Sequence, residues 1–427
     1  RNILYLAAPM TAAQLINVLY SVVDRMYLGR LPGHLALTGV GLTLPVVSII
    51  MGFANLCGTG GAPLCSICRG RGDDEEAERI MGNSFTLLLL FGAAVTVVFL
   101  AFQRPILYLF GASDATYPYA SAYMTIYLLG SIFVMIGLGM NPFISMQGFG
   151  RTGMMTVGLG ALVNIVLDPV FIFGLNMGVR GAALATVIAQ ACSALWVLRF
   201  LTGPKALLRL RRRFLHLHAG RVRRIVALGL SGFCMNLTNS LVQVVCNATL
   251  QRYGGDLYVG VMTIINSLRE VFTMPIQGLN NGAQPVIGYN YGAREMKRVK
   301  KIYDTTLAMT AAMMLAGTLG CLFAAKPLIA LFTANPETIA LGTRALHIIC
   351  LGFIVSAVSV TASGALEGLG KGFSSFIISL LRYVAVIIPA AFILCHTAGP
   401  AFVWHAFWIT EALTAVVAAF VYRQASK

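Results

Sequence analysis

Long apolar stretches recur along the whole chain, separated by short segments that carry glycine, proline or charged residues. A helix that crosses a lipid bilayer needs about 20 mainly apolar residues, whereas a strand of a membrane barrel needs only about 9–11. Twelve stretches are long enough for helices. The pattern predicts membrane-spanning helices over 3–29, 36–61, 80–102, 117–146, 153–175, 181–202, 222–251, 258–287, 299–323, 339–366, 374–396 and 400–422.

The predicted helices divide into two halves of six that repeat one another. Glycines and prolines recur at one constant spacing, at equivalent points of the hydropathy pattern: Gly33 and Gly255, Pro63 and Pro285, Gly70 and Gly292, Gly130 and Gly352. Both halves also contain a Gly-x-Gly-basic turn, from Gly148 to Arg151 and from Gly368 to Lys371. Because each half has an even number of spans, the repeats point the same way across the membrane, and a central cavity is expected at their interface.

Lysine and arginine are distributed unevenly between the two sides of the predicted membrane protein. With the N-terminus placed in the cytoplasm, 22 of them fall in inside segments and 6 in outside segments. The positive-inside rule then places both termini in the cytoplasm. The basic stretch from Arg209 to Arg224 becomes a cytoplasmic linker beside anionic lipid rather than a nucleic-acid site. We therefore expect an N-terminal lobe over 1–203, a linker over 204–221 and a C-terminal lobe over 222–427.

The composition excludes most soluble functions. Hydrophobic residues make up 58% of the chain and charged residues 11%, and the mean hydropathy is +0.80, whereas soluble domains are about 25% charged. The net charge of +16 comes from basic residues that cluster between the apolar stretches. This distribution is typical of membrane topology and not of a nucleic-acid groove. The sequence contains no GxxxxGK[ST] motif, and the GxGxxG at Gly148 joins two apolar spans instead of following a strand. We expect no bound cofactor and no catalytic site.

Five acidic residues lie within or at the ends of predicted spans: Asp24, Asp168, Glu270, Glu367 and Glu411. A charge near the bilayer centre costs at least about 2.5–3.5 kcal/mol, so each is a candidate for function. Glu270 is interpreted either as a cation site of the second half or as the partner of an arginine such as Arg382. Glu367 is expected at the membrane interface, and the pattern does not decide the role of Glu411.

Asp168 lies near the middle of its span, with Asn164 one helical turn earlier and Pro169 immediately after it. Proline lacks an N–H group, so it frees a backbone carbonyl inside the membrane and is expected to bend the helix. A carboxylate, an amide and a free carbonyl together can hold a proton or a small hard cation such as Na⁺. The alternative is an aspartate that only packs the helix bundle.

Asp24 ends the first span, and Asn17 and Tyr20 precede it by seven and four residues. This spacing puts the three side chains on one face of the helix, where Asn17 and Tyr20 are expected to line a substrate cavity. The alternative is that Asp24 simply faces water at the membrane end.

Several stretches resemble the multidrug and toxic compound extrusion (MATE) family, and the similarity extends over essentially the whole chain. They are NVLYSVVDRMYLG at 17–29, NIVLDPVFIFG at 164–174, GVRGAALAT at 178–186, and the turns at Gln147-Gly148 and Glu367-Gly368. The resemblance implies an all-α polytopic membrane protein with twelve helices in two six-helix lobes. It also implies a monomeric antiporter of a bacterial plasma membrane that exchanges H⁺ or Na⁺ for organic cationic or amphipathic compounds.

The resemblance is greatest to the prokaryotic DinF-type branch of the family. In that branch the cation-coupling site lies in the N-terminal lobe, which here implies Asp24, Asn164, Asp168 and Thr186, with Na⁺ a candidate at the first three. A proline that bends the first helix matches Pro9. Other branches use acidic residues of the C-terminal lobe, which makes Glu270 the secondary candidate.

Three other functions remain as alternatives at this point. A flippase for lipid-linked oligosaccharides would need an arginine-rich cavity, and only Arg269, Arg344 and Arg382 lie within spans. A membrane-embedded transferase would need a convergent catalytic set, and a channel would need rings of selectivity residues. The sequence displays neither of these patterns.

Overall fold

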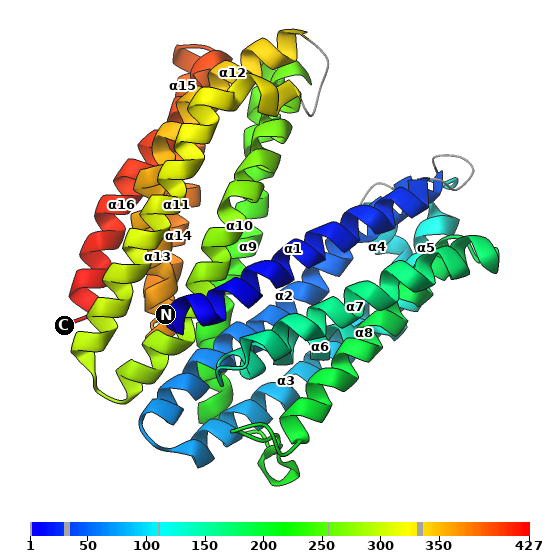
Figure 1. Ribbon diagram of the computed structural model, residues 1–427. Coiled ribbons are helices and arrows are strands. Elements are labelled where there is room, and N and C mark those ends of the chain that lie inside the picture. Colours follow the sequence, from blue (N-terminus) through cyan, green and yellow to red (C-terminus); the bar gives the residue numbers. More distant parts are fainter. Residues whose placement is uncertain (1, 30–34, 110–111, 255, 331–335) are drawn as a thin grey trace. The chain divides into compact units, whose positions relative to one another are not determined.

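The structure is a computed structural model that describes residues 2–29, 35–109, 112–254, 256–330 and 336–427 (Figure 1). In this part of the chain every regular element is a helix. The residues group into two compact units, Arg1–Leu230 and Ser231–Lys427.

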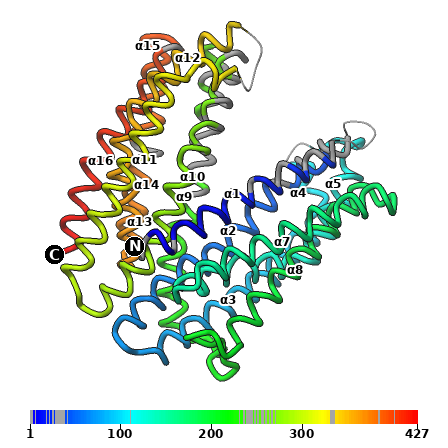
Figure 2. The backbone as a smooth tube through the Cα atoms, in the orientation of Figure 1, coloured from blue at the N-terminus to red at the C-terminus, as the bar shows by residue number. Residues whose placement is uncertain are grey.

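The N-terminal unit is a bundle in which α7 packs against α1 and α8, while α2 packs against α3, α5 and α6 (Figure 2). A π-helical turn, η1, continues α7, and a short 3₁₀ turn, η2, follows α8. The elements are α1 (Asn2–Gly29), α2 (Leu35–Gly70), α3 (Asp74–Ala101), α4 (Gln103–Leu109), α5 (Tyr117–Leu129), α6 (Ser131–Ser145), α7 (Gly150–Pro169), η1 (Val170–Gly174), α8 (Val179–Thr202) and η2 (Arg212–Phe214).

The C-terminal unit is a second bundle, in which α13 packs against α10, α11 and α16. Its first helix, α9, begins in the N-terminal unit and continues into this one. The elements are α9 (Ala219–Gly254), α10 (Asp256–Gly292), α11 (Met296–Ala330), α12 (Pro336–Ile349), η3 (Cys350–Gly352), α13 (Phe353–Gly368), α14 (Gly372–Leu380), η4 (Leu381–Ile387), α15 (Ile388–Thr397), η5 (Pro400–Phe402) and α16 (His405–Ala425).

Each of the twelve predicted spans overlaps one helix or a run of consecutive helices, which confirms the all-α polytopic fold class. Among the described residues, seven helices are long and apolar enough to cross a membrane. The number rises to eight if α5 and α6, which meet at an angle of 56°, are counted together as one bent span. Large apolar side chains such as Val97, Phe323 and Val416 are exposed on the outer surface of the bundles. Such exposure is costly in water and suits contact with lipid.

The repeat between the two halves is visible in the helix ends. Gly70 ends α2 and Gly292 ends α10, and the next helices, α3 and α11, begin at equivalent positions. Gly130 precedes α6 as Gly352 precedes α13. The predicted repeat is therefore confirmed at these helix boundaries. The pair Gly33 and Gly255 lies outside the described residues.

The structure corrects how the Gly-x-Gly turns of the two halves correspond. The backbone adopts positive φ at Gly148 (94°) and Gly370 (76°), which have the spacing of the repeat, and the following helices start at Gly150 and Gly372. The two Gly-x-Gly-basic motifs begin instead at Gly148 and Gly368, which are not equivalent under that spacing. The turn requires glycine only where the backbone is in the left-handed region. Gly148 therefore corresponds to Gly370, and the similar order of residues in the two motifs does not define equivalent positions.

Candidate functional site

Helix α7 places Asn164 and Asp168 on one buried face of the N-terminal unit. Asn164 is 1% exposed and Asp168 is 0% exposed. Immediately after Asp168, Pro169 ends the α-helical hydrogen bonding and η1 continues with π-helical turns, in which the Leu175 N–H donates to the Val170 carbonyl at 2.9 Å. π-Helical turns inside helices often mark functional sites, because they shift side chains out of the regular register.

Asp24 reaches this face from α1, which packs against α7. The carboxyl groups of Asp24 and Asp168 lie within hydrogen-bonding reach of each other. Within the described chain, neither carboxylate oxygen of Asp168 receives a hydrogen bond from an N–H or O–H donor. Two carboxylates in contact repel strongly away from water, and a proton or a cation between them would relieve this repulsion.

Thr186 of α8 lies beside this pair of carboxyl groups and contacts Asn164. Its hydroxyl donates to the Ala182 carbonyl at 3.0 Å and to the Asn164 Oδ1 at 3.4 Å. The start of α8 lies close to η1, since a Cβ at Gly181 would be only 2.6 Å from the Phe171 carbonyl oxygen. Gly181, the second glycine of GVRGAALAT, therefore lets α8 approach the helix that carries Asn164 and Asp168.

Two tyrosines of α5 complete the site, and the sequence analysis did not find them. The rings of Tyr123 and Tyr127 stack with centroids 6.0 Å apart, and both side chains are buried. The Tyr123 hydroxyl lies within hydrogen-bonding reach of Thr186. Their signal in the sequence is an i, i+4 pair inside the tyrosine-rich stretch from Tyr117 to Tyr127.

The other predicted residues of the N-terminal unit are placed as follows. Tyr20 is half-buried and close enough to Asp24 and Asp168 to interact electrostatically with both. Asn17 lies two turns before Asp24 on α1 and has an exposed side chain. Pro9 lies inside α1, which continues as one helix past this proline.

The secondary candidate, Glu270, lies on α10, and its side chain is outside the described residues. The C-terminal unit does contain a buried ion pair between Arg382 and Glu411, in which the Arg382 Nε donates to Glu411 Oε1 at 3.0 Å. The Arg269 guanidinium lies over the Phe407 ring, 5.3 Å from its centroid. These side chains line a small cavity of about 40 Å³, which is large enough for a water molecule.

Glu367 is held by side chains of its own unit. It accepts hydrogen bonds from the Gln284 Nε2 at 3.0 Å and from the Ser375 hydroxyl at 3.1 Å. Glu367 therefore connects the end of α13 to α10 and α14. The sequence predicted this residue at the membrane interface, and its contacts here are structural ones between helices.

The carboxylate pair has no counterpart in the second half of the chain. Under the spacing of the repeat, the positions equivalent to Asp24, Asn164, Asp168 and Thr186 are Cys246, Val386, Ala390 and Trp408. The acidic cluster is therefore a property of the N-terminal unit. In the described ranges, no three histidine, cysteine or acidic side chains gather as a transition-metal site would require, and the groups around Asp168 are hard oxygen donors, which suit a proton or an alkali cation.

Comparison with known proteins gives consistent matches over the whole chain. A model of the MatE family matches residues 9–170 and 233–393. The multidrug export protein MepA of Staphylococcus haemolyticus (strain JCSC1435) is 26% identical over 423 residues, covering 99% of this chain and 92% of that protein. MepA of Staphylococcus aureus (strain NCTC 8325 / PS 47) is 26% identical over 425 residues, with coverages of 99% and 93%.

Solved structures of a MATE protein share the fold. The crystal structure of MATE in the straight conformation is 25% identical, with a TM-score of 0.92 over 100% of this chain and 95% of that chain. The structure in the bent conformation is 24% identical, with a TM-score of 0.95 and the same coverages.

Proposed function

The chain belongs to the MatE family of multidrug efflux transporters, and from this premise we propose that it exports organic cationic or amphipathic compounds in exchange for H⁺ or Na⁺. It is a transporter and not an enzyme, which removes the transferase alternative. The observation that carries the proposal is the contact between the buried Asp168 carboxyl group and the carboxyl group of Asp24 in the helix bundle of the N-terminal unit.

In the proposed mechanism the cation binds at the carboxylate pair. A proton or Na⁺ entering from outside relieves the repulsion between Asp24 and Asp168. The Asn164 Oδ1, bonded by the Thr186 hydroxyl, supplies a further oxygen at the same face of α7. When the cation leaves toward the cytoplasm, the repulsion returns, and the hydrogen bonds around Asn164 and Pro169 rearrange.

Binding of the cation and of the drug must be coupled for transport to occur. Each ligand shifts the equilibrium between inward-open and outward-open states only by its difference in affinity for the two, and the coupling is reciprocal. We propose that the N-terminal and C-terminal lobes alternate between these states, and that cation binding weakens the hold on drug.

The driving force depends on the charge of the substrate. One elementary charge that moves through 100 mV yields about 2.3 kcal/mol, equivalent to roughly a fiftyfold concentration gradient of an uncharged compound. Exchange of a monovalent organic cation for one proton is electroneutral, so only the proton concentration gradient drives it.

The proposed setting is the plasma membrane of a bacterium, with both termini in the cytoplasm and one chain as the transport unit. The excess of lysine and arginine in the predicted inside segments supports this orientation. Organic compounds and the bilayer are the proposed partners, and nucleic acid is not one of them.

The flippase alternative is less well supported by the arginines. Such a protein would need guanidinium groups directed at a pyrophosphate. Arg382 instead pairs with Glu411, Arg269 lies over Phe407, and Arg344 is exposed.

The test is efflux of a fluorescent cationic dye from liposomes under an imposed pH gradient or an imposed Na⁺ gradient. Asp168→Asn should abolish gradient-driven transport, because the pair can no longer bind a cation through two carboxylates. Asp114→Asn is the matched control, since Asp114 is exposed in a loop, where it accepts a bond from the Tyr108 hydroxyl. Transport that survives Asp168→Asn would contradict the proposed site, and absence of dye movement in wild type would contradict the proposed activity.

A further inference from the structure

The segment that joins α8 to α9, residues 203–218, is fixed to the body of the N-terminal unit and is not a free tether. We call it the linker segment. Its Leu207 and Leu208 N–H groups donate to the Gln147 Oε1 at 2.9 and 3.0 Å. At its other end the His218 N–H donates to the Asn83 Oδ1 at 2.9 Å, and the Leu215 carbonyl accepts from the Thr86 hydroxyl at 2.6 Å.

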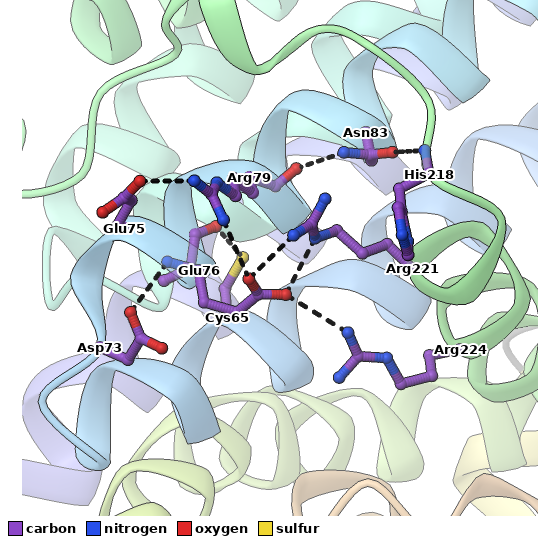
Figure 3. Close-up of polar contacts among 10 residues, drawn as sticks. Cys65, Asp73, Glu75, Glu76, Arg79, Asn83, His218, Arg221 and Arg224 are labelled. Atoms are coloured by element: carbon purple, nitrogen blue, oxygen red, sulfur yellow. Dashed lines mark hydrogen bonds and ion pairs between the residues drawn. The ribbon is translucent and has the colours of Figure 1, made fainter.

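The acidic first turns of α3 pair with some of the basic residues of this region. Figure 3 shows Arg221 and Arg224 meeting at Glu76, with Nε and Nη2 distances of 2.9 and 3.3 Å. Glu78 accepts from the Arg211 Nε at 2.9 Å. These three arginines are therefore neutralised within the protein.

The other acidic residues of the same turns also have internal partners. Asp73 caps α3 by accepting from the Glu76 N–H at 3.1 Å, and Glu75 pairs with Arg79 at 2.6 Å (Figure 3). Asp74 is exposed at the start of the helix, where a negative charge is favoured by the helix dipole.

Four further cations of the region are exposed, and in the described part of the chain they form no ion pair: Lys205, Arg212, Arg213 and Arg223. Two of them, Arg212 and Arg213, directly precede the buried Phe214. This side chain is 8% exposed, and its carbonyl oxygen lies where a Cβ at Gly82 would be only 2.4 Å away. The Arg213 guanidinium covers the Phe214 ring, 4.7 Å from its centroid. Because Phe214 is held against α3, the preceding arginines remain on the surface.

The linker segment is expected at the level of the lipid headgroups, because it follows a helix long and apolar enough to cross the membrane. It begins directly after Thr202, the last residue of the membrane-spanning α8. That helix has 24 residues, a length of about 36 Å, so it extends past a hydrocarbon core of about 30 Å. Two leucines of the segment, Leu207 and Leu217, are 55% and 43% exposed, as suits side chains that enter the interface between headgroups and acyl chains.

We propose that Lys205, Arg212, Arg213 and Arg223 form a binding surface for the headgroups of anionic phospholipids. The protein uses its own carboxylates for Arg211, Arg221 and Arg224 and leaves these four cations to the membrane. The partner is identified by its charge, by the depth of the segment and by the two exposed leucines beside it. The inference is independent of the coupling ion and of the drug.

The test measures binding of phosphatidylglycerol and of phosphatidylcholine to the full chain in detergent by native mass spectrometry. Wild type should prefer phosphatidylglycerol. Arg212→Gln/Arg213→Gln should weaken its binding at least about tenfold, since each cation near a headgroup contributes roughly a fivefold effect. Arg212→Lys/Arg213→Lys keeps the charges and should retain wild-type binding, which distinguishes lost charge from lost structure.

The matched control removes two arginines from the opposite end of the same unit. Arg180 lies at the start of α8 and Arg104 at the start of α4, and both are exposed. Arg104→Gln/Arg180→Gln should change phosphatidylglycerol binding less than twofold. The proposal is overturned if the Arg212→Gln/Arg213→Gln protein binds phosphatidylglycerol as tightly as wild type. It is also overturned if wild type does not distinguish the two lipids, or if millimolar inorganic phosphate displaces the lipid, which would identify a site for a soluble anion.

Discussion

The Thr186 hydroxyl on α8 lies 3.4 Å from the Asn164 Oδ1 on α7, and it shares its single proton between this oxygen and the Ala182 carbonyl, 3.0 Å away on α8. Asn164 is one helical turn from Asp168, so α8 contributes to the surroundings of the carboxylate without supplying a charge. The contribution of the Thr186 hydroxyl can therefore be tested separately from that of the carboxylates.

Thr186→Val should reduce the apparent affinity for the coupling ion while leaving the carboxylates in place. The loss of one net hydrogen bond is worth about 0.5–1.5 kcal/mol, which corresponds to roughly a twofold to tenfold higher ion concentration for half-maximal transport. Thr202→Val is the control at the other end of α8, where the hydroxyl donates to the Leu198 carbonyl of the same helix. An unchanged ion dependence in Thr186→Val would remove Thr186 from the site.

Gly181→Ala should destabilise the N-terminal unit, because the new Cβ would lie 2.6 Å from the Phe171 carbonyl oxygen. Overpacking of this kind costs about 1–3 kcal/mol, which would be detected as a lower thermal unfolding midpoint in detergent. At Gly158, on α7, no atom lies within 4 Å of an added Cβ. Gly158→Ala should be neutral or slightly stabilising, since alanine is the better helix former; equal midpoints for the two variants would show that the close contact is absent.

Glu411→Leu should destabilise the C-terminal unit strongly. The side chains of Arg382 and Glu411 are only 16% and 9% exposed, and removal of one partner of a buried ion pair costs about 3–5 kcal/mol. Arg382→Met/Glu411→Leu removes both charges and should recover much of the lost stability. The comparison uses unfolding midpoints of the two purified variants, and a double variant less stable than Glu411→Leu would show that the charges do not act as a pair.

Gln147→Leu should release the linker segment from the N-terminal unit. The variant loses the acceptor of the Leu207 and Leu208 N–H groups and the donor to the Leu208 carbonyl. These bonds together are worth about 1–3 kcal/mol, so limited trypsin cleavage after Lys205 or Arg209 should be roughly tenfold faster. Gln190→Leu, a change of the same type on α8, should leave the cleavage rate unaltered, and equal rates in both variants would indicate that Gln147 does not hold the segment.

Hydropathy and residue spacing predicted the twelve spans and the repeat, because burial in lipid imposes a minimum helix length and duplication preserves glycine positions. They did not predict the breaks inside spans, such as the bend of 56° between α5 and α6 or the π-helical turns of η1 and η4. These irregularities shift the hydrogen-bond register only locally and leave the average hydropathy of the segment unchanged.

For the candidate site, the sequence indicated residues that share one helix more readily than residues that meet across helices. Asn164 and Asp168 follow from their spacing of four, and Thr186 came from the family resemblance. Tyr123 and Tyr127 were missed because their proximity to Tyr20 and Thr186 depends on how α5 packs. The pairing of Arg382 on η4 with Glu411 on α16 was missed for the same reason.

The boundary between the two compact units falls after Leu230, within α9 and not in the linker segment. The first turns of α9 are held in the N-terminal unit, where a Cβ at Gly229 would be 2.0 Å from the Leu56 carbonyl oxygen. The chain passes from one unit to the other once, through the continuous backbone of a helix. The link between the two units is therefore a hydrogen-bonded helical backbone, which resists twisting and bending more than a flexible loop would.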